Sequence, residues 1–380
     1  MKKIVIATDS WKGCLNSQEA GEALRQGIRN IYPSCEVVLI PVADGGEGLL
    51  EALLPVFQGH AVTTRAHNPL MQPITTSYVI SADGQTALIE MAQICGLTLI
   101  SPDQRNPMKT TTFGLGELIR EALEKGCRRF IIGIGGSATN DGGLGMLQAL
   151  GVRVLDRHGK TLGQGGAILQ EVADIDTSQL HPALSEATFT IACDVDNPFY
   201  GNRGATRVYA SQKGATPAMI EELEKGMHSL AEVMARTNGQ KIAQTPGAGA
   251  AGGIGGAFLA FTHARLTPGI ELILKELQFS EQIKDADLII TGEGRADAQT
   301  SMGKVAYGVL QEGRKQNIPV VLICGAIEEN PALYAAGFSG IFSISPGPTS
   351  LEQALRPDFA RYNLQRLASQ LCRLLESLKA

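Results

Sequence analysis

The hydrophobic pattern of the first forty residues predicts a strand, a helix and a second strand of one parallel sheet. The run KIVIA at residues 3–7 is typical of a buried strand. Apolar positions then recur at i, i+3, i+4 and i+7 up to about Tyr32, and Asn16 with Glu19 forms a capping box at the start of this helix. The second strand covers residues 37–40. This order implies a right-handed crossover, with ligands at the carboxyl ends of the strands.

The pattern changes in the middle of the chain. Residues 60–91 alternate short β-rich pieces with turns, which predicts an antiparallel meander in an inserted second sheet. An amphipathic helix over residues 115–123 and a buried strand at 130–134 then resume the parallel α/β pattern. A further strand at 189–193 and a long helix that begins at Pro217 belong mostly to the second domain.

Three short buried strands in the last third of the chain complete the sheet of the first domain. They lie at residues 288–290, 320–323 and 341–344. The predicted fold class is therefore α/β with two domains, a Rossmann- or flavodoxin-like parallel-sheet domain and an inserted mixed α/β domain. The first domain is assigned residues 1–60, 95–140 and 285–380, and the inserted domain residues 61–94 and 141–284. We expect the active site in the cleft between the two domains.

Composition limits the possible classes of function. A chain of 380 residues exceeds the size at which one hydrophobic core stops growing, which favours two domains. The formal net charge of −5 argues against binding to nucleic acid or to an anionic membrane, because both need a basic field. Seven cysteines without a CxxC pair favour reduced thiols and a cytoplasmic location. No stretch approaches the roughly 18 apolar residues of a spanning helix.

Four glycine-rich loops follow predicted strands and concentrate charged residues. They cover residues 9–13, 43–48, 133–143 and 291–300. Glycine lets amide groups line up around phosphate oxygens. The candidate cations, with one just beyond the last loop, are Lys12, Arg295 and Lys304. The candidate carboxylates are Asp44, Glu47, Glu293 and Asp297 in these loops, together with Asp194 and Asp196 after the strand at 189–193. Phosphoryl transfer needs this combination of flexible backbone, cations, carboxylates for Mg²⁺ and a base.

Each loop also has a purely structural interpretation. A single glycine-rich loop after a strand is as often a simple chain reversal, and Asp9 or Asp141 could cap local backbone. The GxGxxG at Gly247, Gly249 and Gly252 lacks the preceding strand of a dinucleotide fold, which indicates a close-packed loop or helix start. No P-loop motif is present, and the SxxK at residues 301–304 stands without its usual companion motifs. The shared position of the charged loops is what favours a phosphoryl-transfer site.

Taken together, these stretches resemble the bacterial glycerate kinase family over nearly the whole chain. The motifs that carry the resemblance are residues 9–13, 43–48, 133–143, 193–198, 212–217, the Gly/Ala stretch ending at Gly255, and 291–300 with Gly303 and Lys304. The resemblance implies ATP-dependent phosphorylation of D-glycerate at its 2-hydroxyl, giving 2-phospho-D-glycerate, with Mg²⁺ as the metal. Trp11 replaces a family Phe, Ala298 stands where Ser is common, and Ser301 with Met302 replaces small residues. These departures bear on substrate fit more than on activity.

Roles for individual residues follow from this resemblance. The residues expected to act in catalysis are Asp194, Lys12, Arg295 and Asp297, with Asp194 as base or Mg²⁺ ligand. The residues expected to bind substrate or phosphate are Asp9, Ser10, Asp44, Gly45, Gly46, Gly135, Gly136, Ser137, Glu293 and Lys304. Glu293 is also a candidate metal ligand.

Several alternatives stay open at this point. The chain could instead phosphorylate another small sugar or hydroxy acid, or it could be a non-catalytic regulator that binds a nucleotide or a carboxylate. The residues alone leave open the choice between the 2- and the 3-hydroxyl, the domain that holds ATP and the oligomeric state.

Overall fold

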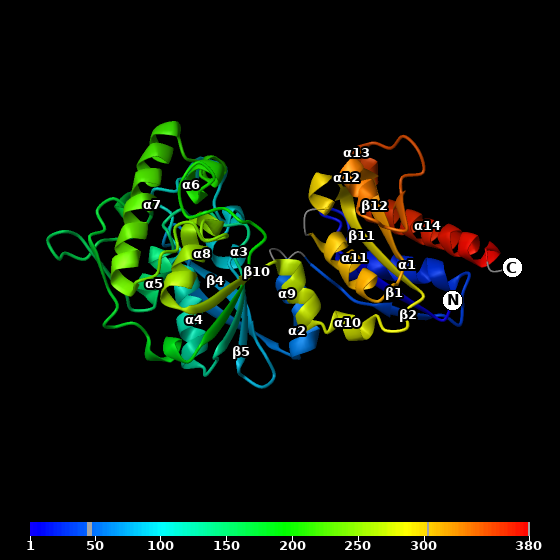
Figure 1. Cartoon of the computed structure of the whole chain (residues 1–380), viewed down its shortest axis with the longest axis horizontal. Helices are drawn as coiled ribbons and strands as arrows, with labels where there is room; N and C mark the ends of the chain where they lie inside the picture. Colours follow the sequence, from blue (N-terminus) through cyan, green and yellow to red (C-terminus); the bar gives the residue numbers. More distant parts are fainter. Residues whose placement is uncertain (44–47, 302–303, 379–380) are drawn as a thin grey trace. The chain divides into compact units, whose positions relative to one another are not determined.

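The structure is a computed structural model that describes residues 1–43, 48–301 and 304–378. It divides into two compact units (Figure 1). Unit 1 contains Met1–Asp44 and Ile270–Ala380, and unit 2 contains Gly45–Gly269. The middle of the chain is therefore an insertion into the first unit, as the sequence predicts.

The sheet of unit 1 contains five parallel strands in the order β13-β12-β11-β1-β2. Their bounds are β1 Lys3–Thr8, β2 Glu36–Leu39, β11 Leu288–Ala296, β12 Val320–Ile327 and β13 Gly340–Ser343. Counted within the unit, this order is 2-1-3-4-5 from the β2 edge, which is the flavodoxin-like arrangement. The predicted α/β class is confirmed.

Helices cover the sheet of unit 1. They are α1 Ser17–Arg29, α9 Gly269–Glu276, α10 Phe279–Gln282, α11 Val305–Lys315, α12 Pro331–Ala335, α13 Leu351–Ala354 and α14 Pro357–Ser377, with a 3₁₀ turn at Ala298–Ser301. Asn16 and Glu19 form the predicted capping box of α1. This helix ends at Arg29, before Tyr32, because the backbone tightens into a turn in which the Ile31 N–H bonds to the Ile28 carbonyl at 3.0 Å.

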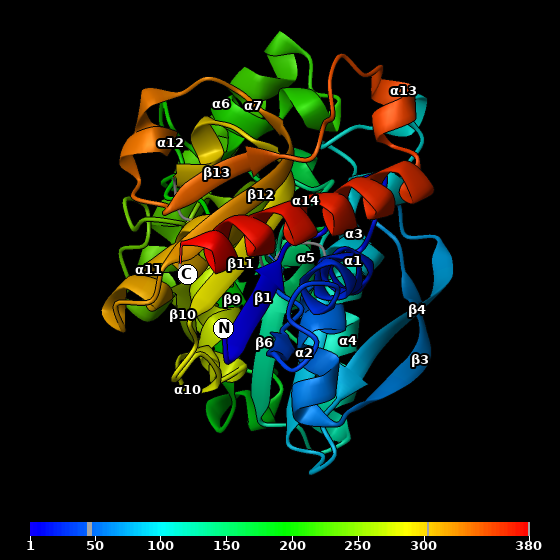
Figure 2. The same ribbon diagram turned by 90° about the vertical axis from the view of Figure 1, so that its right-hand side faces the viewer.

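Helices α1 and α14 pack side by side (Figure 2). A Cβ atom at Gly27 would lie 2.3 Å from the carbonyl oxygen of Gln365, so only glycine permits this approach. The Ser369 hydroxyl donates to the Gly27 carbonyl at 2.8 Å. The first helix and the last helix of the chain are thus locked together.

The sheet of unit 2 contains six strands in the order β10-β9-β6-β5-β4-β3. Their bounds are β3 His60–His67, β4 Pro73–Ile80, β5 Thr86–Glu90, β6 Arg129–Gly133, β9 Thr188–Ala192 and β10 His263–Thr267. The pairs β3–β4 and β4–β5 are antiparallel, and the other pairs are parallel. The predicted meander is therefore present, joined edge to edge with three parallel strands in one mixed sheet.

The predicted domain borders need correction. Residues 48–60 and 95–140, which the sequence predicts in the first domain, belong to unit 2, whereas residues 270–284, predicted in the inserted domain, belong to unit 1. The reason is the pairing of β6, which lies between β5 and β9, with Ile132 opposite Ile191. The apolar sequence of β6 does not reveal which strands it pairs with. Its partners β5 and β9 lie in the inserted unit.

Seven helices surround the sheets of unit 2. They are α2 Leu49–Phe57, α3 Ala92–Cys95, α4 Phe113–Glu124, α5 Leu144–Ala149, α6 Ala205–Tyr209, α7 Pro217–Asn238 and α8 Ala250–Phe261, among the described residues. A small antiparallel pair, β7 Arg153–Leu155 and β8 Asp174–Asp176, stands apart. Short 3₁₀ turns occupy Leu97–Leu99, Pro102–Gln104, Gly166–Ile168, Pro182–Ser185 and Ser211–Lys213.

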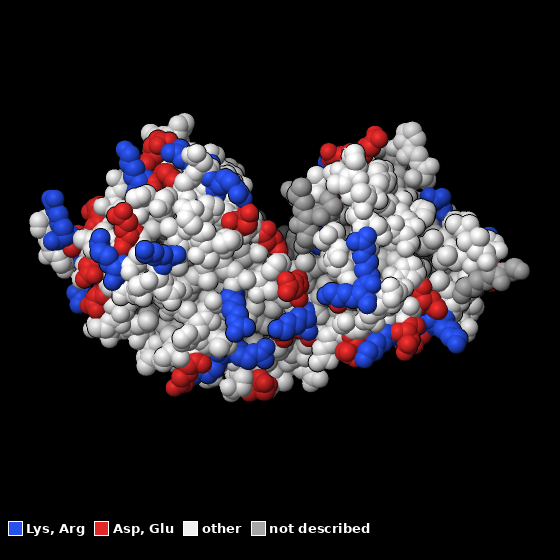
Figure 3. Space-filling view, in the orientation of Figure 1, with Lys and Arg blue, Asp and Glu red and all other residues white. Residues whose placement is uncertain are grey.

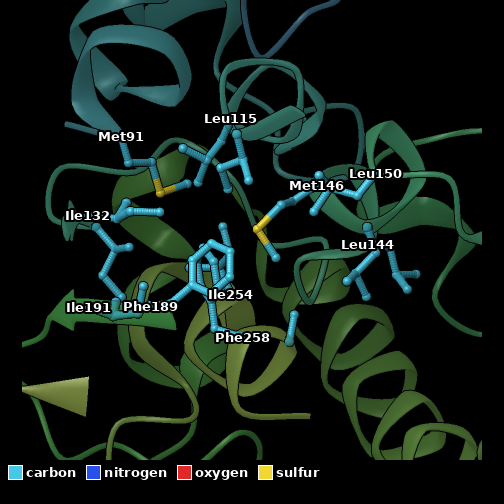
Figure 4. Close-up of a cluster of buried hydrophobic side chains, with 14 of the residues drawn as sticks. Met91, Leu115, Ile132, Leu144, Met146, Leu150, Phe189, Ile191, Ile254 and Phe258 are labelled. Atoms are coloured by element: carbon cyan, nitrogen blue, oxygen red, sulfur yellow. The ribbon is translucent and has the colours of Figure 1, made fainter. Parts of the chain in front are cut away.

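The core of unit 2 lies between the parallel strands and helices α4, α5 and α8 (Figure 4). Ile132 of β6 and Phe189 of β9 face Ile254 and Phe258 of α8 in this cluster, and all four side chains are buried. The Phe189 ring also stacks on Phe130, with ring centroids 4.7 Å apart. This packing holds the ends of β6 and β9 in fixed positions.

The charged residues of the surface and the state of the cysteines agree with what the composition predicts. On the face shown in Figure 3, Lys and Arg side chains are interspersed with Asp and Glu. All seven cysteines lie in the described part of the chain, and each is a free thiol. None of the described helices combines the length and the apolar character that crossing a bilayer requires.

Candidate active site

Unit 1 holds a pocket of about 740 Å³ at the carboxyl ends of β1 and β11. The strand order reverses at this point, which is where open α/β sheets bind ligands. Seven residues predicted from the sequence line this pocket together: Asp9, Ser10, Lys12, Glu293, Arg295, Asp297 and Lys304. Residues about 280 positions apart in the chain therefore meet in one pocket because β1 pairs with β11.

The loop after β1 is held by its own backbone. The Asp9 N–H donates to the Gly292 carbonyl at 2.8 Å, and the Asp9 carboxylate accepts the Ser10 N–H at 2.7 Å. Trp11 and Leu15 exchange backbone hydrogen bonds across the turn. Asp9 therefore binds local backbone, as the structural interpretation of the sequence predicts. The same hydrogen bonds fix the start of the loop that carries Lys12, which lines the pocket.

Glu293 is a buried acid of this pocket with a strongly raised pKa. Its side chain is 9% exposed, and its Oε1 has no hydrogen-bond partner among the described residues. Burial raises the pKa of Glu293 to about 7, opposed by the Thr300 hydroxyl and the Lys304 ammonium, while the charges of Asp9 and Asp297 raise it further. A carboxyl group in this state exchanges a proton near neutral pH.

Arg295 and Asp297 follow Glu293 at the edge of the pocket. The Arg295 guanidinium pairs with Glu328 at 2.5 Å, but both side chains are more than half exposed, so the pair adds little to stability. The Asp297 N–H donates to the Thr300 hydroxyl oxygen at 2.9 Å, and the Thr300 N–H donates to the Asp297 carbonyl at 3.1 Å. Thr300 thus orders the turn that carries Asp297.

This pocket also has apolar lining residues, which sequence reasoning missed. They are Ile327, Ile344, Leu351, Leu355 and Phe359. Leu351 is 74% exposed although it is apolar. Exposed apolar side chains beside a charged pocket are typical of ligand sites. The lining of the pocket thus combines charged and apolar side chains.

Unit 2 has a smaller pocket of about 370 Å³, lined by the loops that follow β6 and β9. It brings together four predicted residues: Gly135, Gly136, Ser137 and Asp194. The Asp194 carboxylate accepts the N–H of Gly269, the first residue of α9, at 2.7 Å. This bond caps the helix and fixes the position of the carboxylate. Asp196, also a candidate, is absent from the residues that line the pocket and pairs with Arg203 at 2.8 Å.

Lys213 also lines the unit 2 pocket and was not among the predicted site residues. It is 2% exposed, and its Nζ donates to the Ser137 hydroxyl oxygen at 2.8 Å and to the Thr139 carbonyl at 2.7 Å. Burial lowers the pKa of Lys213 to about 7, against the opposing charge of Asp141. The only signal in the sequence was its place in one of the motifs that carry the resemblance, since a 3₁₀ turn has no periodicity that reveals a buried lysine.

Asp141 has the capping role that the sequence left open. Its buried carboxylate accepts five hydrogen bonds, from the backbone of Thr112, Gly143 and Gly145 and from the hydroxyls of Thr111 and Thr112. Burial raises the pKa of Asp141, and these donors oppose the rise. The residue anchors the end of the glycine-rich loop and the start of α5.

The GxGxxG stretch forms the start of α8, which confirms a close-packed loop or helix start. A Cβ atom at Gly252 would lie 2.0 Å from the Thr139 carbonyl oxygen, so the backbones touch here. Ala251 adopts the left-handed conformation with φ +52°, which L-residues avoid, and it lines the unit 2 pocket. Strain of this kind gathers at functional sites.

Some predictions fall outside what the structure describes. Asp44, Gly45, Gly46 and Glu47 lie outside the described residues, as do Met302 and Gly303. Among the described residues, no group of three or more His, Cys, Asp and Glu side chains clusters as a metal site.

A parallel α/β unit with cations and carboxylates at its switch point is an arrangement expected of an enzyme that handles anionic substrates. The sequence profile of the Glycerate kinase family matches residues 4–376. The chain is 44% identical to the glycerate 2-kinase of Escherichia coli K12 over 93% of each chain. It is 43% identical to the glycerate kinase of Bacillus subtilis 168, over 99% of this chain and 98% of that one.

A solved structure agrees with these relatives. The crystal structure of a Salmonella typhimurium LT2 protein assigned as glycerate kinase 2 superposes with a TM-score of 0.90 at 42% identity, covering 100% of this chain and 99% of that one. The chain belongs to the glycerate kinase family.

Proposed function

We propose that this protein transfers the γ-phosphoryl group of ATP to the 2-hydroxyl of D-glycerate and releases 2-phospho-D-glycerate. The family and the name of the Escherichia coli relative support the reaction. The observation that carries it is the gathering of Lys12, Arg295, Lys304 and buried Glu293 in one pocket at the switch point of unit 1. Phosphoryl transfer depends on positioning and charge stabilisation, and this set supplies both.

ATP is assigned to the pocket of unit 1. Three cationic side chains among its lining residues, Lys12, Arg295 and Lys304, suit a polyphosphate, while the apolar Leu351 and Phe359 suit a purine base. Asp9 and Ser10 line the same pocket and bind the nucleotide or its metal. The unit 2 pocket is smaller, and Lys213 is the one cation among its lining residues.

Mg²⁺ is the proposed metal, and Glu293 with Asp297 would hold it. The buried Oε1 of Glu293 has no partner among the described residues, so a cation there would satisfy it. The absence of a larger cluster among the described residues does not disfavour Mg²⁺, since the ion takes one or two carboxylates and fills its other positions with water and phosphate. When bound, it neutralises charge on the phosphates.

Asp194 is the proposed base for the hydroxyl of the acceptor or, alternatively, a second metal ligand. Its carboxylate is fixed by Gly269 and lines the unit 2 pocket, next to the predicted cradle of Gly135, Gly136 and Ser137. The seven free thiols support a reducing compartment such as the cytoplasm as the place where the protein works.

The test is ATP consumption by the purified protein with Mg²⁺ and D-glycerate, with the product identified by NMR. We expect 2-phosphoglycerate. Formation of 3-phosphoglycerate would refute the regiochemistry alone. Turnover only with another member of a hydroxy-acid panel would move the assignment to that acid, and nucleotide binding without any turnover would favour a regulator.

A further inference from the structure

We propose that the unit 2 pocket is the hydroxy-acid site, in which Lys213 and Ser137 bind the carboxylate of the acid and Asp194 faces its hydroxyl. This inference rests on the proposed function, because it takes one substrate to be a small hydroxy acid. It assigns a substrate-binding role to Lys213 and separates the acid from the nucleotide.

The hydrogen-bond donors of the unit 2 pocket support the binding of an anion. An ammonium carries three donors, and Lys213 uses two of them on Ser137 and Thr139. The Ser137 hydroxyl oxygen accepts from Lys213, so its own hydrogen is available to a ligand. In the part of the chain that the structure describes, the amide groups of Gly135, Gly136 and Ser137 donate no backbone–backbone hydrogen bond. Successive backbone N–H groups in a turn are the donors from which anion nests are built.

The charges in the unit 2 pocket also favour the binding of an anion. Lys213 forms no ion pair among the described residues, and both of its partners are neutral oxygens. The nearby Asp141 carboxylate is already satisfied by its five donors. A buried ammonium without a direct counterion is costly, so a carboxylate that enters the pocket is favoured.

Size and charge distinguish this acid from ATP. The unit 2 pocket has half the volume of the unit 1 pocket, about 370 against 740 Å³. Lys213 is the one cation among the residues that line it, against three in unit 1. Asp194 would repel a polyphosphate, but its carboxylate accepts a hydrogen bond from a hydroxyl. A short acid with one carboxylate and a neighbouring hydroxyl satisfies both ends.

The test replaces Lys213 with methionine, which keeps the length of the side chain and removes the charge. We expect the KM for D-glycerate to rise at least about 30-fold, with the KM for ATP changed less than about twofold. Calorimetric titration of D-glycerate into the enzyme without ATP should show the same loss of affinity. Lys225→Met, on the exposed face of α7, is the matched control and should change neither constant.

The two pockets also give a reciprocal control. Lys12→Met in unit 1 should raise the KM for ATP and leave the affinity for D-glycerate unchanged. If circular dichroism shows that the Lys213→Met protein does not fold, the Ser137→Ala variant is measured in its place. A smaller rise in the KM for D-glycerate is then expected.

Failure of this inference is distinct from failure of the proposed function. A folded Lys213→Met enzyme whose KM for D-glycerate is unchanged, or whose KM for ATP rises instead, overturns the inference and leaves the kinase activity standing. If the wild-type protein turns over only another hydroxy acid, the same titrations are made with that acid. If it binds no hydroxy acid at all, both proposals fall.

Discussion

Replacing Glu293 with glutamine removes a buried carboxyl whose charge the fold disfavours. The pKa of Glu293 is raised from 4.5 to about 7, chiefly by burial. Below pH 4.5 this group is protonated in both the folded and the unfolded chain and does not affect stability. Between pH 4.5 and 7 the folded chain binds more protons than the unfolded chain, so the free energy of unfolding falls as the pH rises. Glutamine is neutral throughout and lacks this fall.

The size of the effect follows from the pKa. A rise from 4.5 to about 7 corresponds to about 3 kcal/mol, at about 1.4 kcal/mol per pKa unit. The Glu293→Gln protein should therefore be more stable than the wild type by up to about 3 kcal/mol at pH 8 and by less than about 1 kcal/mol at pH 5. The same change should lower kinase activity, since stabilised active sites commonly lose function.

Urea denaturation of both proteins at pH 5, 6, 7 and 8 measures this difference. Two units can unfold separately, so the transition that belongs to unit 1 has to be followed, for example by the fluorescence of its single tryptophan, Trp11. Glu328→Gln, an exposed carboxylate paired with Arg295, is the control and should shift stability by less than about 1 kcal/mol. A stability difference between wild type and Glu293→Gln that stays constant from pH 5 to pH 8 would refute the reasoning.

Two further predictions concern unit 2. Asp194→Asn should lower kcat by at least about 10²-fold in the steady-state assay, the low end for a positioned base, whereas Asp196→Asn should change it little; a near-normal kcat for Asp194→Asn would remove this residue from catalysis. Asp141→Ala should destabilise the protein by about 3 kcal/mol or more, because it leaves buried N–H donors unpaired next to Lys213; a loss below about 1 kcal/mol in denaturant titration would contradict the anchoring role.

The sequence predicted best what local rules control. The capping box of α1, the start of α7 at Pro217 and the strand runs all depend on neighbours within a few residues, and the structure has them. The unit 1 pocket was also predictable in outline, because parallel strands place their following loops at one edge of the sheet. Strand-end loops that share acids and cations therefore pointed to residues that the structure brings together in one pocket.

The features that could not be predicted from the sequence depend on contacts between distant segments of the chain. The apolar run of β6 looks the same whichever sheet it joins, so its partners β5 and β9 could not be read from it. The burial of Lys213 depends on how a 3₁₀ turn packs against the loop at Ser137. The apolar lining residues of the unit 1 pocket come from four separate segments, including Leu351 of α13 and Phe359 of α14, and each of them fits ordinary packing equally well in the sequence.

The insertion of unit 2 between β2 and β11 has a consequence for biosynthesis. Unit 2 is one continuous stretch of chain, so it can fold as soon as it has left the ribosome. The strand β1 must wait for β11, because it is an interior strand of the sheet and requires a partner on each side. Nascent chains that stop before β11 would expose the apolar edge of β1, which promotes aggregation. Among the strands of this sheet, β1 therefore waits longest in synthesis for its second partner, and this is where a chaperone is needed most.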